Sequence, residues 1–242
     1  MNLDDLLEYC AAQNFDAVDI TAYYFPGYPE VPSDEYLYHI KQKAFLLGLD
    51  ISGIGVRNDF TEPDSIKRWA SVQLVKNWIL AAEKLGAPVI RVFAGHVETP
   101  AEKRTEVFNF LVADMKECVQ FGKEHGVVVA MQNHNDFVKT STEVIEVMEA
   151  VDSEWFGLIL DTGSYRSGDP YAQIAETIPY AVNWQLKEKI YVDGEEQDVD
   201  LPRLIKLIRD GGYRGYIPIE TLGEGDPRVK VEKFFEKVKG QL

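Results

Sequence analysis

The feature that most restricts the fold of this 242-residue chain is a repeated order of segments: an amphipathic segment, a glycine and a short apolar run. Clear copies are LLGLDISGIGV (Leu46–Val56), KLGAPVIRVF (Lys84–Phe93), EHGVVVAMQ (Glu124–Gln132) and GGYRGYIPIE (Gly211–Glu220). Glycine at a helix end takes the left-handed conformation at little steric cost. Apolar runs without clean alternation are typical of parallel strands buried on both faces. The pattern therefore predicts alternating helices and parallel strands.

The expected elements follow from these runs and their polar boundaries. Helices are expected near residues 3–13, 34–47, 63–85, 100–125, 141–150, 170–178, 201–210 and 228–239. Strands are expected near residues 17–21, 49–56, 88–94, 127–132, 156–161, 181–187 and 215–220. Eight helices and seven strands, with a helix first, predict an α/β fold of the (β/α)8 TIM-barrel type that lacks its first strand. Residues 1–242 show no linker or change in composition, so a single domain is expected.

The absent first strand leaves two alternatives open. Either the barrel is open at one edge, or the sequence begins at an internal methionine of a longer gene product. An exposed parallel edge can pair with another chain, so we expect a covered edge or a homodimer.

Charge and hydropathy restrict the partners of the chain. The formal net charge is -15, which opposes binding to nucleic acid and to anionic membrane surfaces. No apolar stretch is long enough to cross a bilayer. The first ten residues, MNLDDLLEYC, are acidic and helical in pattern, unlike a signal peptide. We therefore expect a cytoplasmic protein with a small-molecule partner, and neither a nucleic acid nor a membrane.

Polar side chains close four of the predicted strand runs. Gln132 ends VVVAMQ, Asp161 ends FGLILD, Gln185 ends AVNWQ and Glu220 ends IPIE. A polar end to a buried apolar run is costly unless it lies in a shared site. Parallel strands bring such ends to one rim, where the active sites of β/α barrels lie. The sequence therefore predicts an enzyme site built from these four residues.

The same residues suggest a metal site. Two carboxylates with neutral oxygen donors suit Mg²⁺ or Mn²⁺, so Asp161 and Glu220, with Gln132 and Gln185, are candidate ligands. Residues two apart on a strand share a face, so Lys187 is expected to point the same way as Gln185.

Other polar residues near the predicted rim are candidate substrate contacts. Arg91 lies inside an apolar strand and needs a partner, which is either a substrate or a carboxylate such as Asp19 or Asp50. His96 and His134 follow the strands near 88–94 and 127–132 and should reach the rim.

An aromatic segment follows the first predicted strand. Tyr24, with Tyr23, Phe25 and Tyr28, can stack on a sugar ring, and a packed loop is an equal alternative.

The segments VIRVFAGH, VVVAMQNHNDF, FGLILDTGSY, AVNWQLKE and GYIPIETLG resemble, in order and spacing, the sugar phosphate isomerase/epimerase group with the xylose isomerase-like TIM barrel. The resemblance implies a divalent metal held by Glu, Asp, His and Glu from the fifth to the eighth strand. Asp161 and Glu220 match this pattern, whereas Gln132 and Gln185 stand where Glu and His are expected. The substitutions imply a weak Mn²⁺ or Mg²⁺ site, or none.

The resemblance also implies an isomerase or epimerase that removes a proton next to the carbonyl of a sugar or keto-sugar. Glu220 would be the base, Lys187 would stabilise the oxyanion, and His134 would donate or relay a proton. Because Gln132 cannot titrate, a single base suits isomerisation or elimination better than two-sided epimerisation.

Other functions stay open from the sequence. Gln132 and Gln185 also suit a non-catalytic carbohydrate-binding barrel whose metal site has decayed, and the chemistry allows a keto-sugar lyase. The DNA-repair endonuclease branch of the same barrel superfamily is disfavoured. Its multi-zinc site needs many histidines, and this chain has four histidines and a charge of -15.

Overall fold

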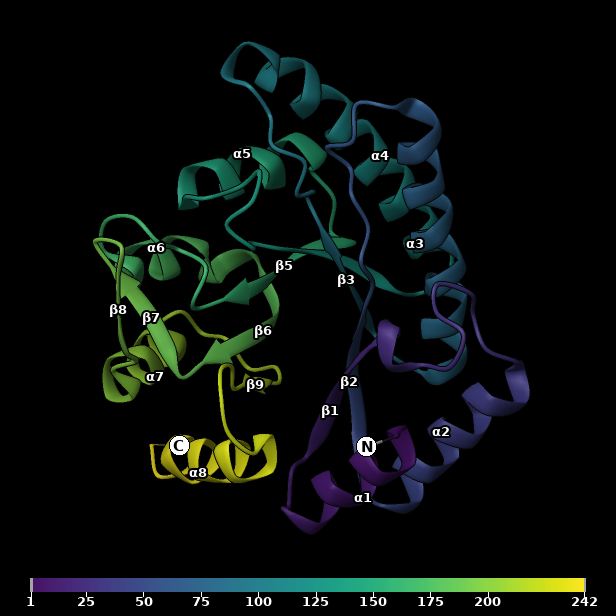
Figure 1. Ribbon diagram of the computed structural model, residues 1–242, viewed down its shortest axis with the longest axis vertical. Helices are drawn as coiled ribbons and strands as arrows, with labels where there is room; N and C mark the ends of the chain where they lie inside the picture. Colours follow the sequence, from purple (N-terminus) through teal and green to yellow (C-terminus); the bar gives the residue numbers. More distant parts are fainter. Residues whose placement is uncertain (1, 242) are drawn as a thin grey trace.

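A computed structural model describes residues 2–241 of the chain. Seven parallel strands form one curled sheet in the order β1-β2-β3-β4-β5-β6-β9, with helices along its outer side (Figure 1). The strands are β1 (Ala17–Thr21), β2 (Asp50–Gly55), β3 (Val89–Phe93), β4 (Val128–Gln132), β5 (Phe156–Asp161), β6 (Ala181–Lys187) and β9 (Ile219–Glu220). The α helices are α1 (Leu3–Ala12), α2 (Asp34–Leu46), α3 (Ser65–Leu85), α4 (Arg104–Glu124), α5 (Ser141–Val151), α6 (Pro170–Thr177), α7 (Leu201–Asp210) and α8 (Pro227–Lys239). The predicted TIM-barrel type with seven parallel strands is thus confirmed.

The local sequence explains where these elements begin and end. Every α helix except α4 starts at a side chain that accepts a hydrogen bond from the first turn, as Asp64 does for α3. Gly86 ends α3 with a φ of 78°, and Gly126 follows α4 with a φ of 68°. Side chains rarely adopt these angles, so glycine is favoured at both turns into the next strand.

The structure corrects two of the predicted boundaries and adds one hairpin that was not predicted. The helix expected from residue 100 begins as a 3-10 turn at Ala101–Lys103, and the α helix starts at Arg104. The strand expected over 215–220 is only Ile219–Glu220. Residues between β6 and α7, which the sequence left unassigned, form the antiparallel hairpin β7 (Lys189–Val192) and β8 (Glu195–Asp198). The Asp193-Gly194 pair is the signal for this hairpin, because both residues have positive φ, as a tight two-residue turn requires.

The barrel interior contains a small apolar cluster and several long polar side chains. Val89, Ala130 and Ile159 form a buried cluster separate from the main core between sheet and helices. Two glycines of β2 make room for long polar side chains. A Cβ at Gly53 would lie 2.7 Å from Asp19 Oδ2, and one at Gly55 would lie 2.5 Å from Arg91 Nη2.

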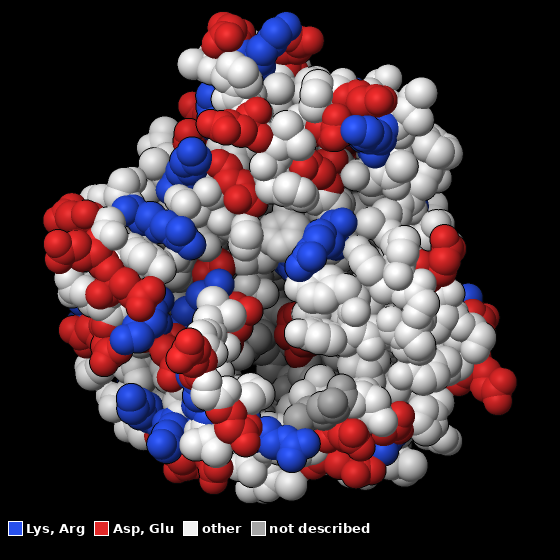
Figure 2. Space-filling model, in the orientation of Figure 1, with Lys and Arg blue, Asp and Glu red and all other residues white. Residues whose placement is uncertain are grey.

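The sheet is open between β1 and β9, which do not pair in the described part of the chain. Figure 2 shows a hollow near the middle of the molecule on this side. Side-chain contacts cross the gap beside these strands: the Tyr216 hydroxyl donates to Asp50 of β2, and the rings of Phe15 and of Phe235 in α8 lie 4.1 Å apart between centroids. A covered edge or a homodimer stays a prediction.

The main core connects the two ends of the described chain. Its buried apolar residues extend from Leu3 in α1 to Val238 in α8, and the single domain predicted from the sequence stays a prediction. Among residues 2–241, no helix has the length and hydropathy needed to span a bilayer.

Candidate active site

Four strand ends meet at the C-terminal rim of the barrel. Gln132, Asp161, Lys187 and Glu220 are the last residues of β4, β5, β6 and β9. In the sheet register Asp161 is paired with Gln185, and Lys187 is paired with Glu220. The structure therefore brings five of the candidate residues into one group, which we call the rim cluster: Gln132, Asp161, Gln185, Lys187 and Glu220.

Lys187 is the centre of the rim cluster. Its ammonium nitrogen lies 3.0 Å from Asp161 Oδ2 and 3.2 Å from Glu220 Oε2. The Lys187 side chain is 15% exposed and the Asp161 side chain is fully buried, whereas the Glu220 side chain is 38% exposed. Burial lowers the pKa of Lys187, but the two carboxylates outweigh it and raise that pKa above its ordinary value. Lys187 is therefore a fixed positive charge at neutral pH.

Asp161 has hydrogen bonds or ion pairs on both carboxylate oxygens. Oδ1 accepts a hydrogen bond from the Gly163 backbone at 2.9 Å, and Oδ2 accepts one from Gln132 Nε2 at 2.7 Å. Asn133, which we did not identify from the sequence, fixes the Asp161 backbone by bonds of 2.8 and 3.0 Å. Asp161 is thus held by hydrogen bonds on its backbone and on both carboxylate oxygens, and its Oδ2 contacts the Lys187 ammonium.

The two glutamines are hydrogen-bonded to each other, and Gln132 is also bonded to Asp161. Gln132 Nε2 also donates to Gln185 Oε1 at 2.7 Å. The reverse amide orientation would place Gln132 Oε1 against a carboxylate oxygen and a carbonyl oxygen, so the donor orientation is set by its partners. Gln132 consequently presents its amide nitrogen, and not its oxygen, to Asp161.

Three buried polar atoms on interior-facing side chains have no hydrogen-bond partner among the described residues. They are Arg91 Nη1, Gln132 Oε1 and Glu220 Oε2, the last of which has only its ion pair with Lys187. An unpaired buried polar atom costs about 1–3 kcal/mol. One donor and two acceptors of this kind suit a ligand rich in hydroxyl groups, because a hydroxyl can both donate and accept.

A polar layer in the barrel interior involves β1, β3 and β6. Asn183 Nδ2 donates to Asp19 Oδ2 at 2.8 Å. Burial raises the pKa of Asp19 to about 6, although Arg91 and Asn183 act to lower it. Arg91 thus interacts electrostatically with Asp19, one of the two carboxylates predicted from the sequence, but no carboxylate oxygen of the described residues lies within 4.0 Å of its nitrogens. Asp50 instead accepts from Tyr216.

The pKa of Asp19 gives a prediction about stability. It is 3.8 for an ordinary Asp and about 6 in the folded protein, so folding favours the protonated form. The stabilisation of that form is present at low pH and is lost as pH rises through about 6. We expect Asp19→Asn to raise the free energy of unfolding at pH 8 by up to about 3 kcal/mol, with little change at pH 4.

Urea unfolding of both proteins at pH 4, 6 and 8 measures this effect. Asp193→Asn, at an exposed turn residue, is the control and should change stability by less than about 0.5 kcal/mol at each pH. An equal effect of Asp19→Asn at pH 4 and pH 8 would show that Asp19 is not the titrating group.

Four other candidates, Arg91, His134, His96 and Tyr24, lie outside the rim cluster. His134 Nδ1 contacts Asp136 Oδ2 at 2.8 Å, and its ring lies 4.8 Å from the Phe93 ring. The Arg91 guanidinium lies on that same Phe93 ring at 4.2 Å. None of the described contacts of His134 reaches Lys187 or Glu220, so its proposed part in proton transfer stays a prediction.

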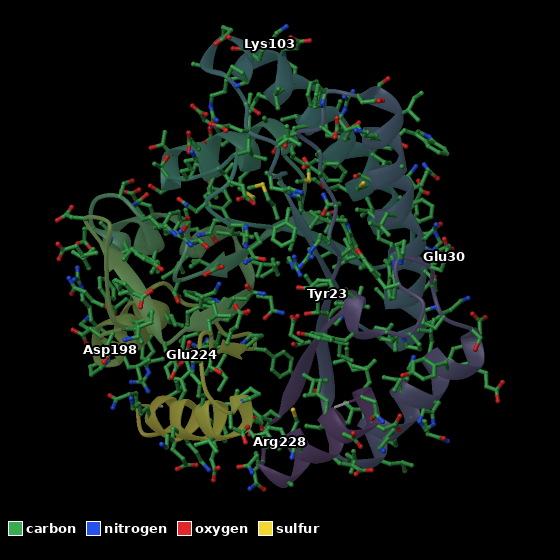
Figure 3. The ribbon with its side chains drawn as sticks, viewed as in Figure 1. Tyr23, Glu30, Lys103, Asp198, Glu224 and Arg228 are labelled. Carbon is green, nitrogen blue, oxygen red and sulfur yellow. The ribbon has the colours of Figure 1, made fainter. Side chains whose placement is uncertain are left out.

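His96 and Tyr24 are more exposed than the cluster. His96 Nδ1 lies 3.4 Å from Asp59 Oδ2, and its side chain is 57% exposed. Tyr24 is 68% exposed and contacts the Tyr23 ring at 5.4 Å. Figure 3 shows Tyr23 near the middle of the molecule, in the segment that follows β1. Both residues stay predicted substrate contacts.

A cavity of about 530 Å³ lies directly against Lys187 and Glu220. It is formed by the loops after β5, β6 and β9, the hairpin, and residues of α7 and α8, and its lining includes Gly163, Tyr191 and Leu222. Its volume falls within the range of about 300–1,000 Å³ found for small-molecule sites. Figure 2 shows mixed acidic and basic side chains on this side of the molecule. The cavity gives a ligand access to the charged end of the cluster.

Comparison with known proteins identifies the family. A family model described as "Xylose isomerase-like TIM barrel" matches residues 7–237. The chain belongs to this xylose isomerase-like family. The match confirms the resemblance seen in the sequence, and comparison with curated protein sequences finds none that matches.

Solved structures of the xylose isomerase-like fold superpose over nearly the whole chain. A 3-keto-D-glucoside 4-epimerase from E. coli has 13% identity and a TM-score of 0.82, covering 99% of this chain and 94% of that one. D-psicose 3-epimerase from Clostridium cellulolyticum H10 has 17% identity and a TM-score of 0.77, covering 99% and 86%. A xylose isomerase-like TIM barrel protein from Mycobacterium smegmatis in complex with magnesium has 16% identity and a TM-score of 0.75, covering 99% and 89%. At these identities the likeness establishes the fold.

The residues of this xylose isomerase-like chain do not fit a divalent metal at the rim. No group of three or more His, Cys, Asp or Glu side chains within residues 2–241 is placed to hold one. A cation between Asp161 and Glu220 would meet the Lys187 ammonium, and Gln132 turns a donor toward the same place. The ligand set predicted from Asp161, Glu220, Gln132 and Gln185 for Mn²⁺ or Mg²⁺ therefore stays a prediction that this geometry opposes.

Proposed function

We propose that this protein is an enzyme that moves a proton on a carbon next to the carbonyl of a small sugar or keto-sugar, and so isomerises or epimerises it. The proposal depends mainly on one observation: the Lys187 ammonium contacts the partly exposed Glu220 carboxylate at the wall of the rim cavity. A base and a fixed cation side by side are what proton removal next to a carbonyl requires.

Each residue has a defined part in this step. Glu220 takes the proton from the carbon, and the electron pair of that C–H bond becomes the double bond of an enediolate. The carbonyl oxygen becomes an oxyanion, which Lys187 stabilises by a charge-assisted hydrogen bond. Return of the proton from Glu220 to the neighbouring carbon, with the hydroxyl proton of the enediolate passing to the former carbonyl oxygen, completes isomerisation. Epimerisation would need a proton from a second acid on the opposite face of the same carbon, because Glu220 reaches one face only. Asp161 contacts no reacting atom and positions Lys187.

The remaining polar residues of the barrel interior are suited to binding the substrate. Gln132 Oε1 can accept a hydrogen bond from a sugar hydroxyl, and Arg91 Nη1 can donate one, since neither has a partner among the described residues. Solved neighbours that include a 3-keto-D-glucoside 4-epimerase and a D-psicose 3-epimerase support a carbohydrate as the substrate class.

Proton exchange with solvent tests the proposal without knowledge of the product. Purified protein is incubated in D₂O with ketopentoses, ketohexoses and 3-keto-glycosides, and proton NMR follows the C–H next to the carbonyl. We expect one sugar to lose this signal at least about 100-fold faster than without protein, which is the size of effect that a general base supplies. No exchange with any of the sugars would contradict the proposal.

A carbohydrate-binding protein without catalysis is the second candidate, and Gln132 and Gln185 favour it because amides cannot transfer protons at neutral pH. A thermal-shift assay with the same sugars separates the two. Stabilisation by a sugar that shows no exchange would favour binding alone, whereas loss of a hydroxyl from the sugar would indicate a lyase.

A further inference from the structure

We propose that the Lys187 ammonium is the built-in cation of the rim, and that the chain works without a divalent metal. Glu220 borders the cavity and the Asp161 side chain is fully buried, and two carboxylates in contact with one another's surroundings in this way need a positive charge between them. Here the charge is covalently attached to β6, at 3.0 Å from Asp161 and 3.2 Å from Glu220. The catalytic part of this inference depends on the proposed function, and the metal-binding part does not.

The charges of the cluster favour one cation and disfavour a second. Asp161, Glu220 and Lys187 together carry one net negative charge, and Gln132 and Gln185 are neutral. A divalent ion that contacted both carboxylates would lie within a few ångströms of the ammonium, where like charges repel strongly in a partly buried site.

The hydrogen bonds of the glutamines also disfavour a divalent ion at this site. A hard cation needs oxygen ligands, but Gln132 directs Nε2 toward Asp161 Oδ2 and Gln185 uses Oε1 to accept from Gln132. To offer two amide oxygens to a metal, both side chains would have to turn, and Asp161 would lose a bond of 2.7 Å. The amides are therefore arranged around an ammonium ion, which leaves Lys187 as the group that polarises the substrate oxygen.

Manganese binding to the chain of residues 1–242 tests the inference apart from turnover. Protein freed of metal with EDTA is titrated with Mn²⁺, and electron paramagnetic resonance measures the free ion. We expect no stoichiometric binding up to about 1 mM Mn²⁺. Binding of one ion per chain below that concentration, abolished by Asp161→Asn, would overturn the inference.

A variant that removes the ammonium and introduces a carboxylate tests whether these two changes create a metal site. Gln132→Glu combined with Lys187→Gln should bind Mn²⁺ at least about tenfold more tightly than the wild type, because three carboxylates then face the site. Gln132→Glu with Lys187→Arg keeps the positive charge and is the matched control, expected to behave as the wild type. A folded double variant without this gain would contradict the inference, and if it does not fold, the wild-type titration decides.

Activity separates this inference from the proposed function. For any sugar that shows exchange, EDTA should change the exchange rate by less than about twofold, since Lys187 supplies the cation. Loss of exchange with EDTA, restored by Mn²⁺ or Mg²⁺, would overturn the metal-independent site and leave the proton-transfer function intact. If no sugar exchanges and no Mn²⁺ binds, the proposed function fails and the assignment of the cation stands.

Discussion

Replacing Glu220 by glutamine is expected to lower the rate of carbon-proton exchange by about 10³-fold, because general base catalysis contributes about 10²–10⁴-fold. The amide keeps the size of the side chain and can still contact Lys187, but it cannot take a proton. Glu220 is partly exposed, and Lys187 keeps its ion pair with the buried Asp161. We therefore expect the far-ultraviolet circular dichroism and the melting temperature to stay close to those of the wild type.

Glu224→Gln is the matched control for this experiment. Glu224 is exposed in the loop that follows β9, a few residues from Glu220, and is labelled in Figure 3. The control should exchange at the wild-type rate. A Glu220→Gln protein that keeps more than about a tenth of wild-type exchange would refute the assignment of Glu220 as the base.

The largest effect on stability is expected at Lys187. Its replacement by methionine leaves the fully buried Asp161 without a cationic partner. Removing one member of a buried ion pair costs about 3–5 kcal/mol, because an uncompensated charge stays behind. We expect Lys187→Met to lower the free energy of unfolding by about that amount at pH 7, measured in urea. Lys189→Met, in an exposed ion pair two residues further on, should cost less than about 1 kcal/mol.

A double-mutant cycle isolates the cause of this loss. Asp161→Asn removes the carboxylate charge and keeps one acceptor oxygen, which can accept from Gly163 or from Gln132 but not from both. If the cost of Lys187→Met comes from the buried charge, then adding Asp161→Asn should recover at least about 2 kcal/mol. Additive losses in the double variant would instead show that Lys187 contributes through the packing of its side chain.

Much of the fold was predictable because the signals for it are local. The alternation of amphipathic and apolar segments, with glycine between them, gave the order of eight helices and seven sheet strands. The residues at the rim, such as Asp161, could be predicted because each closes an apolar run. The C-terminal ends of parallel strands lie at the same edge of the sheet. The hairpin after β6 was missed because its strands are short and half-exposed, and Asp193-Gly194 was the one strong turn signal.

The partners of individual side chains could not be predicted in the same way. Gln132 bonds to Asp161 and Gln185, which are 29 and 53 residues away in the sequence. Arg91 was expected to have a carboxylate or a ligand as partner, and its position near Asp19 depends on the space that Gly53 and Gly55 leave in the barrel.

The sequence by itself determined the barrel type, the order of its elements and the polar residues that end its strands, because periodicity and helix ends are encoded over a few neighbouring residues. Only the tertiary structure decided that an ammonium group lies between Asp161 and Glu220. That arrangement depends on the register of β5, β6 and β9 and on distances of about 3 Å between side chains, which the strand pattern does not specify.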